Sequence, residues 1–218
     1  MMSDFAARRV TMVDTQIRPS DVTKFPIIDA MLRVPRERFV PEAQREVAYV
    51  GEMITMGEDR KMLEPRDFAK MLDAVNIQPD ELVLDIGCGL GYSAAVLGDM
   101  AQAVVAVEAY ETLANDANAT LLAEGADNVI VHNCELAAGA PSHAPYDVIF
   151  IEGAVEQIPQ ALLDQLSENG RIIAIFADQG LGNVKIGHKS NTGLSWRFVC
   201  NASADVLPGF ERKKEFTL

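Results

Sequence analysis

The chain has few of the side chains that build metal centres and disulfide frameworks. Only three cysteines and three histidines occur among its 218 residues. They are Cys88, Cys134, Cys200, His132, His143 and His188. No Cys-x-x-Cys pair and no histidine set at zinc spacing occurs, so we expect neither a disulfide nor a structural metal. For each histidine we expect a hydrogen-bonded or solvated structural role, because no acidic partner lies nearby in the sequence.

Long apolar runs and basic side chains are also scarce. No apolar stretch approaches the roughly 20 residues that span a bilayer, and the first residues lack the charged and hydrophobic regions of a signal peptide. Lysine and arginine number 19 against 32 acids, which gives a formal net charge of −13. A nucleic-acid binder needs a basic face for phosphate contacts. We therefore expect a cytoplasmic protein that engages neither a membrane nor nucleic acid.

The most informative stretch that is present is VLDIGCGLGY, residues 83–92, in which a short apolar strand runs into three glycines at alternate positions. Glycine adopts backbone angles closed to other residues and lets a ligand lie against the main chain. A dinucleotide site prefers Gly-x-Gly-x-x-Gly, whereas Gly-x-Gly-x-Gly after an acid, here Asp85, is the spacing of S-adenosylmethionine-dependent methyltransferases. The stretch predicts an S-adenosylmethionine site and makes a hydride-transferring dehydrogenase the weakest alternative.

Strands and helices alternate after residue 81, which predicts a parallel sheet with helices on both faces. The expected strands are 82–86, 103–108, 128–132, 146–151 and 171–176, and the expected helices are 92–100, 110–124 and 159–166. Residues 184–189 and 195–200 flank an Asn-Thr-Gly turn and predict a hairpin. The expected fold class is therefore the α/β class I S-adenosylmethionine-dependent methyltransferase fold, a Rossmann-like αβα sandwich whose parallel sheet ends in a C-terminal antiparallel hairpin.

The first 76 residues follow a different pattern. Two short helices are expected within residues 20–47, interrupted by Pro35 and Pro41, and a further helix over 66–76. The stretch between them, 51–65, has no clean period and is the expected place of substrate contacts. We expect residues 1–76 to form a helical lead-in and substrate loop packed over the cofactor cleft, and residues 77–218 to form the Rossmann-like core, together one structural domain.

Glu108 is the leading predicted cofactor residue after the glycines. It ends the second strand about 20 residues past the first glycine, where a carboxylate accepts hydrogen bonds from both ribose hydroxyls. Asp85 either fixes the turn or reaches the methionine amino group through water. The predicted cofactor-binding residues are Asp85, Gly87, Cys88, Gly89, Gly91, Tyr92, Glu108, Ala109, Cys134 and Glu135.

Three further charged residues are candidates on the acceptor side. Glu152 follows the fourth strand, on the methyl-transfer side of the cleft. It is a candidate catalytic base, although a ligand-orienting or solvated carboxylate is the more frequent outcome at such a position. Arg60 and Lys61 lie in the substrate loop, where two cations can clamp an anionic acceptor such as a carboxylate. The competing interpretation is a solvated charge pair beside Glu58 and Asp59.

Five motifs along the chain carry a family resemblance. They are VPRERFVPE at 34–42, Ala48-Tyr49, VLDIGCGLGYSAAVL at 83–97, APYD at 144–147 and IPQALLDQL at 158–166. Together they resemble the protein-L-isoaspartate O-methyltransferases over residues 20 to 177. The resemblance implies S-adenosylmethionine as methyl donor and a carboxylate of a protein or peptide, that of an isoaspartyl residue, as acceptor. The ester formed there closes to a succinimide, which starts repair.

The substrate loop departs from this family. Its usual sequence is Gly-Gln-Thr-Ile-Ser-Gln-Pro, with the serine hydroxyl beside the transferred methyl, whereas residues 59–65 are Asp-Arg-Lys-Met-Leu-Glu-Pro. Leu63, preceded by Met62, therefore takes the position of the catalytic serine. The family's Gly-Asp-Gly after the third strand is replaced by Asn133, Cys134 and Glu135, so Glu135 or the backbone would accept from the adenine amine. We expect isoaspartyl methylation to be absent or much weaker than in members that keep the serine.

Two other functions stay open at this point. One is a diverged methyltransferase that acts on a small acid or another nucleophile. The other is a regulator that binds S-adenosylmethionine without catalysis and keeps the glycine turn but no acceptor site. Labelled S-adenosylmethionine and an isoaspartyl peptide separate the isoaspartyl methyltransferase from these two, because only that activity converts the peptide to a methyl ester that releases methanol.

Overall fold

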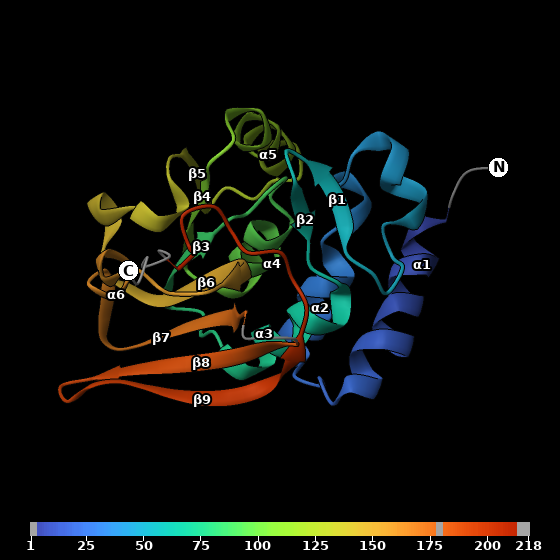
Figure 1. Cartoon of the computed structure of the whole chain (residues 1–218). Coiled ribbons are helices and arrows are strands. Elements are labelled where there is room, and N and C mark those ends of the chain that lie inside the picture. Colours follow the sequence, from blue (N-terminus) through green and yellow to red (C-terminus); the bar gives the residue numbers. More distant parts are fainter. Residues whose placement is uncertain (1–3, 178–180, 213–218) are drawn as a thin grey trace, which may run out of the picture.

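The computed structural model describes residues 4–177 and 181–212, and its centre is a seven-stranded sheet (Figure 1). The strand order is β5-β4-β3-β6-β7-β8-β9. The first five strands in this order run parallel, β8 runs antiparallel to β7, and β9 runs antiparallel to β8. The strands are β3 (Leu82–Ile86), β4 (Ala103–Glu108), β5 (Val129–Asn133), β6 (Tyr146–Val155), β7 (Leu166–Phe176), β8 (Gly182–Ser190) and β9 (Gly193–Ala202). The expected methyltransferase fold class is confirmed.

Helices connect β3 to β4, β4 to β5 and β6 to β7, because each crossover must return the chain to the same end of the sheet, and two 3-10 turns connect β5 to β6. The helices are α4 (Tyr92–Met100), α5 (Glu111–Ala123) and α6 (Gln160–Leu163). The helix expected over 159–166 is shorter than predicted, since Leu166 already pairs with Tyr146 in the sheet. Strands β8 and β9 need only the tight turn at 191–192, as their sequence predicted.

Alternate residues of each central strand enter two separate cores. On one face, Phe150 and Ile173 pack with α2 (Phe25–Arg33), α3 (Pro65–Val75) and α4. The Phe68 ring of α3 lies 5.7 Å from the rings of both Tyr92 and Phe150. On the other face, Ile149 and Ile172 pack with α6 and with Leu207 and Phe210 of the C-terminal segment. The sheet is therefore covered on both sides, as a parallel sheet requires.

The N-terminal region differs from expectation in three ways. Residues 5–17 are helical, with α1 (Phe5–Met12) followed by a π-helical turn (Val13–Ile17). After α2 the chain forms only 3-10 turns, Arg36–Arg38 and Glu42–Val47, because Pro35 and Pro41 each remove a backbone donor. The stretch expected to be irregular contains a β-hairpin of β1 (Ile54–Gly57) and β2 (Arg60–Met62). This hairpin, rather than the helices, is the N-terminal element that reaches the glycine turn.

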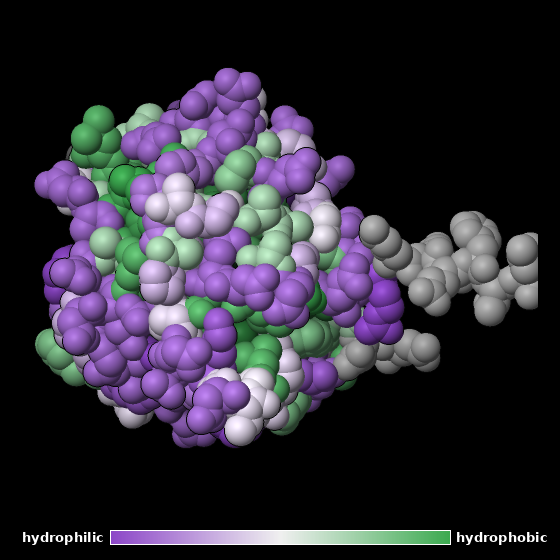
Figure 2. Space-filling view, turned by 90° about the vertical axis from the view of Figure 1, so that its left-hand side faces the viewer, coloured by the Kyte–Doolittle hydropathy of each residue, from purple (hydrophilic) through white to green (hydrophobic). Residues whose placement is uncertain are grey.

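The side of the molecule that carries α6 and the β8–β9 turn is mostly hydrophilic (Figure 2). Figure 2 views the molecule from the side of α6 and the β8–β9 turn, and hydrophobic residues show there in small groups between polar ones. Within the part of the chain that the structure describes, no helix is long and apolar enough to cross a membrane.

Arg171 of β7 joins the end of α3 to the start of β3. Its guanidinium donates to both carboxylate oxygens of Glu81, at 2.8 and 2.7 Å, and to the Val75 carbonyl at 2.7 Å. The Asn76 carbonyl accepts a further bond at 3.2 Å. Both side chains of the ion pair are largely shielded, at 17% and 14% exposure, so their interaction is weakly screened by solvent.

We predict that Arg171→Ala lowers the free energy of unfolding by about 2–4 kcal/mol, because it leaves a half-buried carboxylate and two helix-end carbonyls without their donor. Urea denaturation followed by circular dichroism measures the change. Arg18→Ala is the matched control: its pair with Asp14 is exposed at both ends, and its loss should cost no more than about 0.5 kcal/mol. Equal effects of the two substitutions would contradict the prediction.

Candidate active site

The glycine turn between β3 and α4 is hydrogen-bonded to the neighbouring strand β4. The backbone N–H groups of Gly87 and Cys88 donate to the Val107 carbonyl at 2.8 and 3.2 Å. Gly87, Gly89 and Gly91 have φ of 82°, 56° and 94°, a region that side chains with a Cβ rarely adopt. The turn therefore depends on glycine for its shape as well as for the space above it.

Glu108 organises this turn from the end of β4. Its side chain is fully buried. One carboxylate oxygen accepts from the Gly89 N–H at 2.9 Å, and the other accepts from the N–H groups of Ala109 at 2.9 Å and Tyr110 at 3.3 Å. An ionised carboxylate that accepts several backbone donors is well stabilised. The structure thus places the predicted ribose-binding acid beside the glycines.

Two side chains of the β1–β2 hairpin fill the space over the turn. The Arg60 guanidinium donates from Nη2 to the Gly87 carbonyl at 2.7 Å, and its Nε lies 3.5 Å from a Glu108 oxygen. A Cβ built on Gly87 would lie 2.6 Å from Arg60 Nη2, and one built on Gly89 would lie 2.3 Å from the Met56 methyl carbon. Arg60 is 4% exposed. The interpretation of Arg60 as part of a solvated charge pair was therefore wrong, because its partners lie in the glycine turn.

Two more buried carboxylates lie close to this cation. Asp85 is fully buried and accepts from the Ser93 hydroxyl at 2.7 Å. Burial raises the pKa of Asp85 to about 7, with a further upward contribution from Glu108, against the opposing effects of Ser93 and Arg60. Burial also raises the pKa of Glu152 well above its ordinary value, and the charge of Asp85 adds to this effect. Glu152 Oε1 has no hydrogen-bond partner among the described residues.

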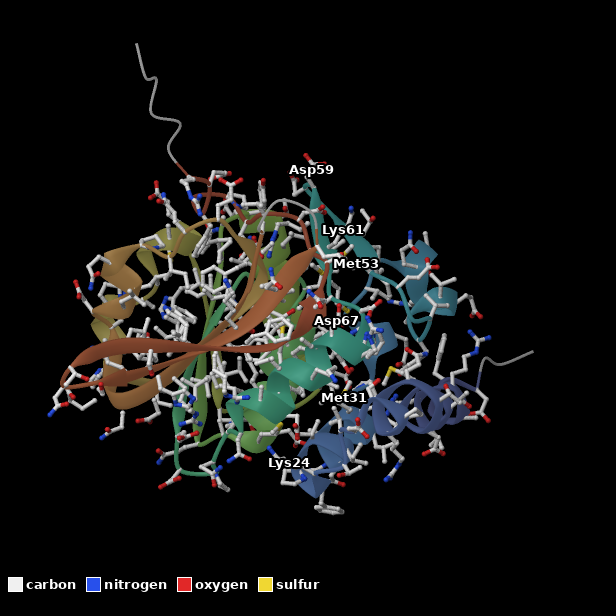
Figure 3. All side chains as sticks on the ribbon, turned by 60° about the horizontal axis from the view of Figure 1, so that its bottom comes forward. Lys24, Met31, Met53, Asp59, Lys61 and Asp67 are labelled. Atoms are coloured by element: carbon white, nitrogen blue, oxygen red, sulfur yellow. The ribbon has the colours of Figure 1, made fainter. Side chains whose placement is uncertain are left out.

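A pocket opens on the outer side of these groups. Its volume is about 90 Å³, below the roughly 300–1,000 Å³ of pockets that enclose drug-sized ligands. The lining comes from the hairpin, from Tyr110, from Glu152 and Gly153 at the end of β6, and from residues 204–208 of the C-terminal segment. Lys61 of the hairpin pairs with Asp205 of that segment at 2.9 Å. Figure 3 shows Met53, Asp59 and Lys61 together at this rim.

The other predicted residues lie away from the pocket lining. Leu63 is buried in the core cluster, and its carbonyl accepts from Arg36 at 2.7 Å. Met62 is buried and pairs with Ile54 across the hairpin. Cys134 donates weakly to the Gly139 carbonyl at 3.5 Å. Glu135 is exposed at the start of a short 3-10 turn.

Sequence reasoning assigned no role to several residues that shape the site. Arg36 is fully buried, lies 4.7 Å above the Tyr92 ring and donates to the Ala48 carbonyl at 2.8 Å. Its only signal was its place in the motif at 34–42. Leu207 packs where a Cβ on Gly153 would lie, at 2.5 Å. Leu207 had no local signal, because the tail meets β6 through long-range pairing such as that between Ala154 and Val206.

The histidines and cysteines form no metal site within the described ranges 4–177 and 181–212, where no group of three or more His, Cys, Asp or Glu residues could hold an ion. His132 and His143 do meet, with their Nε2 atoms 3.0 Å apart. The structural role predicted for these two histidines is therefore confirmed as a hydrogen-bonded pair.

Comparisons with known proteins agree with this geometry. The sequence model of the family described as Protein-L-isoaspartate(D-aspartate) O-methyltransferase (PCMT) matches residues 8–200. The chain belongs to this family. A protein-L-isoaspartate O-methyltransferase from Gloeobacter violaceus is 42% identical over 168 residues, which cover 77% of this chain and 82% of the relative. One from Syntrophobacter fumaroxidans is 36% identical over 178 residues, 82% and 83% of the two chains.

A solved structure described as a protein-L-isoaspartate O-methyltransferase superposes with a TM-score of 0.82 at 25% identity, and the match covers 92% of this chain and 66% of that one. The chain is accordingly an S-adenosylmethionine-dependent methyltransferase, as its glycine turn predicted. The residues present fit this cofactor: a buried carboxylate ends β4, and side chains are excluded from Gly87 and Gly89. Arg60 and Met56 now fill the space that these glycines keep open.

Asp85 should make stability depend on pH in a defined direction. Its folded pKa of about 7 lies above the value of 3.8 expected for an unperturbed aspartate. The folded state thus holds the proton more tightly, and this group lowers the free energy of unfolding as the pH rises from about 4 to 7. Asp85→Asn removes this effect while keeping an acceptor oxygen for Ser93.

We predict that the stability difference between Asp85→Asn and the wild type shifts in favour of the variant by about 1–3 kcal/mol from pH 5 to pH 8. Any constant cost of the new amide cancels in this comparison. Urea unfolding at several pH values measures the shift, with the exposed Asp14→Asn as control. Parallel pH profiles of Asp85→Asn and the wild type would rule out a raised pKa for Asp85.

A second prediction concerns the cofactor. Glu108→Ala should weaken binding of S-adenosylhomocysteine by ~1.5–3 kcal/mol, because it removes a charged acceptor from two ribose hydroxyls. Isothermal titration calorimetry measures the loss, and Glu111→Ala, which removes an exposed carboxylate three residues after Glu108, is the control. Tighter binding of NAD than of S-adenosylhomocysteine by the wild type would contradict the assignment of the turn.

Proposed function

We propose that the protein transfers a methyl group from S-adenosylmethionine to the carboxylate of an isoaspartyl residue in a protein or peptide. The observation that carries this proposal is a pocket that is lined by two cations, Arg60 and Lys61, and lies beside Glu108 and the glycine turn, which Arg60 contacts. Cations at that place suit an anionic acceptor. Membership of the family supports the isoaspartyl carboxylate as that acceptor.

The proposed roles of the residues follow from their surroundings. The cofactor supplies an electrophilic methyl group. A carboxylate nucleophile needs orientation and a desolvated approach more than it needs a base, and Arg60 and Lys61 provide the orientation. Because burial raises the pKa of Glu152, this side chain holds a proton at a pH where an exposed glutamate has lost it. A protonated Glu152 does not repel an anionic acceptor, and it can donate a hydrogen bond to one.

Two broader expectations belong to the same proposal. A cytoplasmic location rests on the sequence alone. The division into a lead-in of residues 1–76 and a core of residues 77–218, within one domain, is supported by the packing of α2 and α3 in the same core cluster as β6 and β7.

The alternative that a specific observation favours is a methyltransferase with a different methyl acceptor. Leu63 stands where the family's loop has its serine, so a hydroxyl partner for the isoaspartyl substrate is replaced by an apolar side chain. A diverged enzyme that esterifies another carboxylate fits this change as well. The distinguishing experiment is incubation with labelled S-adenosylmethionine and an isoaspartyl peptide, followed by release of methanol from the ester in base.

We predict that the wild type methylates an isoaspartyl peptide much more slowly than the Gloeobacter relative, and that Leu63→Ser raises its turnover. The physical reason is that a buried polar substrate group without its partner costs about 1–3 kcal/mol. Leu63→Ala is the matched control, because it removes similar volume from the core without adding a hydroxyl. Turnover is measured at a temperature where all three proteins are folded. Equal rates for the serine and alanine variants would show that the hydroxyl does not limit the reaction.

A further inference from the structure

Arg60 contacts the two groups of the site that should bind the cofactor, Glu108 and the main chain of Gly87. Glu108 has its carboxylate where the ribose hydroxyls of the cofactor should bind, and Gly87 leaves its main chain bare for the same ligand. Arg60 lies against both, at 3.5 Å from Glu108 and 2.7 Å from the Gly87 carbonyl. The guanidinium and the cofactor therefore compete for the same two groups.

Met56 adds a second, uncharged part to this competition. Its terminal methyl carbon and sulfur would lie 2.3 and 2.7 Å from a Cβ on Gly89, so it covers the middle glycine of the turn. Met56 is 7% exposed. Since Met56 and Arg60 belong to the two strands of one hairpin, with a register shift between Thr55 and Gly57, they can leave the turn together as the hairpin moves.

We propose that Arg60 exchanges partners during the reaction cycle: it holds Gly87 and Glu108 before the cofactor binds, and once displaced by the cofactor it binds the acceptor carboxylate. This inference rests on the proposed function and adds an order of events to it. A guanidinium keeps its charge at all relevant pH values and needs an anionic or carbonyl partner when buried. The pocket that Arg60 lines with Lys61 and Glu152 is where that next partner enters.

The exchange has opposite consequences for the two ligands. Only molecules in which the hairpin has left the glycine turn can bind the cofactor, so the apparent cofactor affinity falls in proportion to the fraction of such open molecules. Removing Arg60 or Met56 should therefore strengthen cofactor binding. Removing Arg60 should also weaken the acceptor, because its carboxylate loses a charged donor. A residue that merely supported the fold would not move the two affinities in opposite directions.

The first experiment is calorimetry of S-adenosylhomocysteine with the full chain. We expect Arg60→Ala to bind it about tenfold or more tightly than the wild type, and Met56→Ala to bind it more tightly as well. Arg60→Lys keeps a positive charge beside the buried acids and should give a smaller gain, so it serves if the alanine variant does not fold. Lys24→Ala removes a cation whose pair with Asp73 is exposed and which lies far from the rim in Figure 3; its affinity should stay within about threefold of the wild type.

The second experiment measures methylation of the isoaspartyl peptide at saturating S-adenosylmethionine. Arg60→Ala should raise KM for the peptide at least tenfold, with a smaller change in kcat. Weaker or unchanged binding of S-adenosylhomocysteine by Arg60→Ala overturns the exchange, since Arg60 would then be a ligand of the cofactor or irrelevant to it. If Arg60→Ala binds S-adenosylhomocysteine more tightly but leaves KM for the peptide unchanged, Arg60 does not bind the acceptor carboxylate, and that part of the proposal is overturned. If the wild type turns over no isoaspartyl peptide, the proposed acceptor fails, whereas the calorimetric result still decides whether Arg60 and the cofactor compete.

Discussion

The carboxylate of Glu108 is the interaction on which the site depends. It is anchored by three backbone N–H groups, those of Gly89, Ala109 and Tyr110, and it draws the Arg60 side chain into the interior. Without this carboxylate, the N–H groups at the end of β4 and the Gly89 N–H of the glycine turn would not share a hydrogen-bond acceptor. A single side chain thus anchors the glycine turn to the end of β4 and also contacts the nearest cation.

The part of the structure that could be predicted from the sequence is the part that is specified locally. Strands β3 and β4 are short apolar runs, and the turn between β3 and α4 needs glycine at positive φ. These signals lie within a few residues of one another, so the fold class and the positions of Asp85 and Glu108 follow from them. The C-terminal hairpin was predicted for the same reason, from the turn at 191–193.

The burial of Arg60 could not be predicted in this way. A charged residue next to Glu58 and Asp59 is typical of a solvent-exposed turn. The carbonyl to which Arg60 donates is that of Gly87, which lies 27 positions further along the chain. The hairpin itself escaped prediction because β1 has only four residues and β2 three, too few to establish an alternating pattern. The tail at 204–208 was missed similarly, since its pairing with β6 depends on Leu207 filling the space beside Gly153. The acceptor side is therefore built mostly by long-range contacts.

Met56 on the glycine turn has a consequence for the heat capacity of ligand binding. Burial of apolar surface on binding normally gives a negative heat-capacity change. Here the methionine already shields the turn from water, and its own apolar surface becomes hydrated when it leaves. The two contributions have opposite sign. The heat-capacity change on cofactor binding should therefore be smaller than the contact area of the cofactor alone would give, and its size would report how far the hairpin opens.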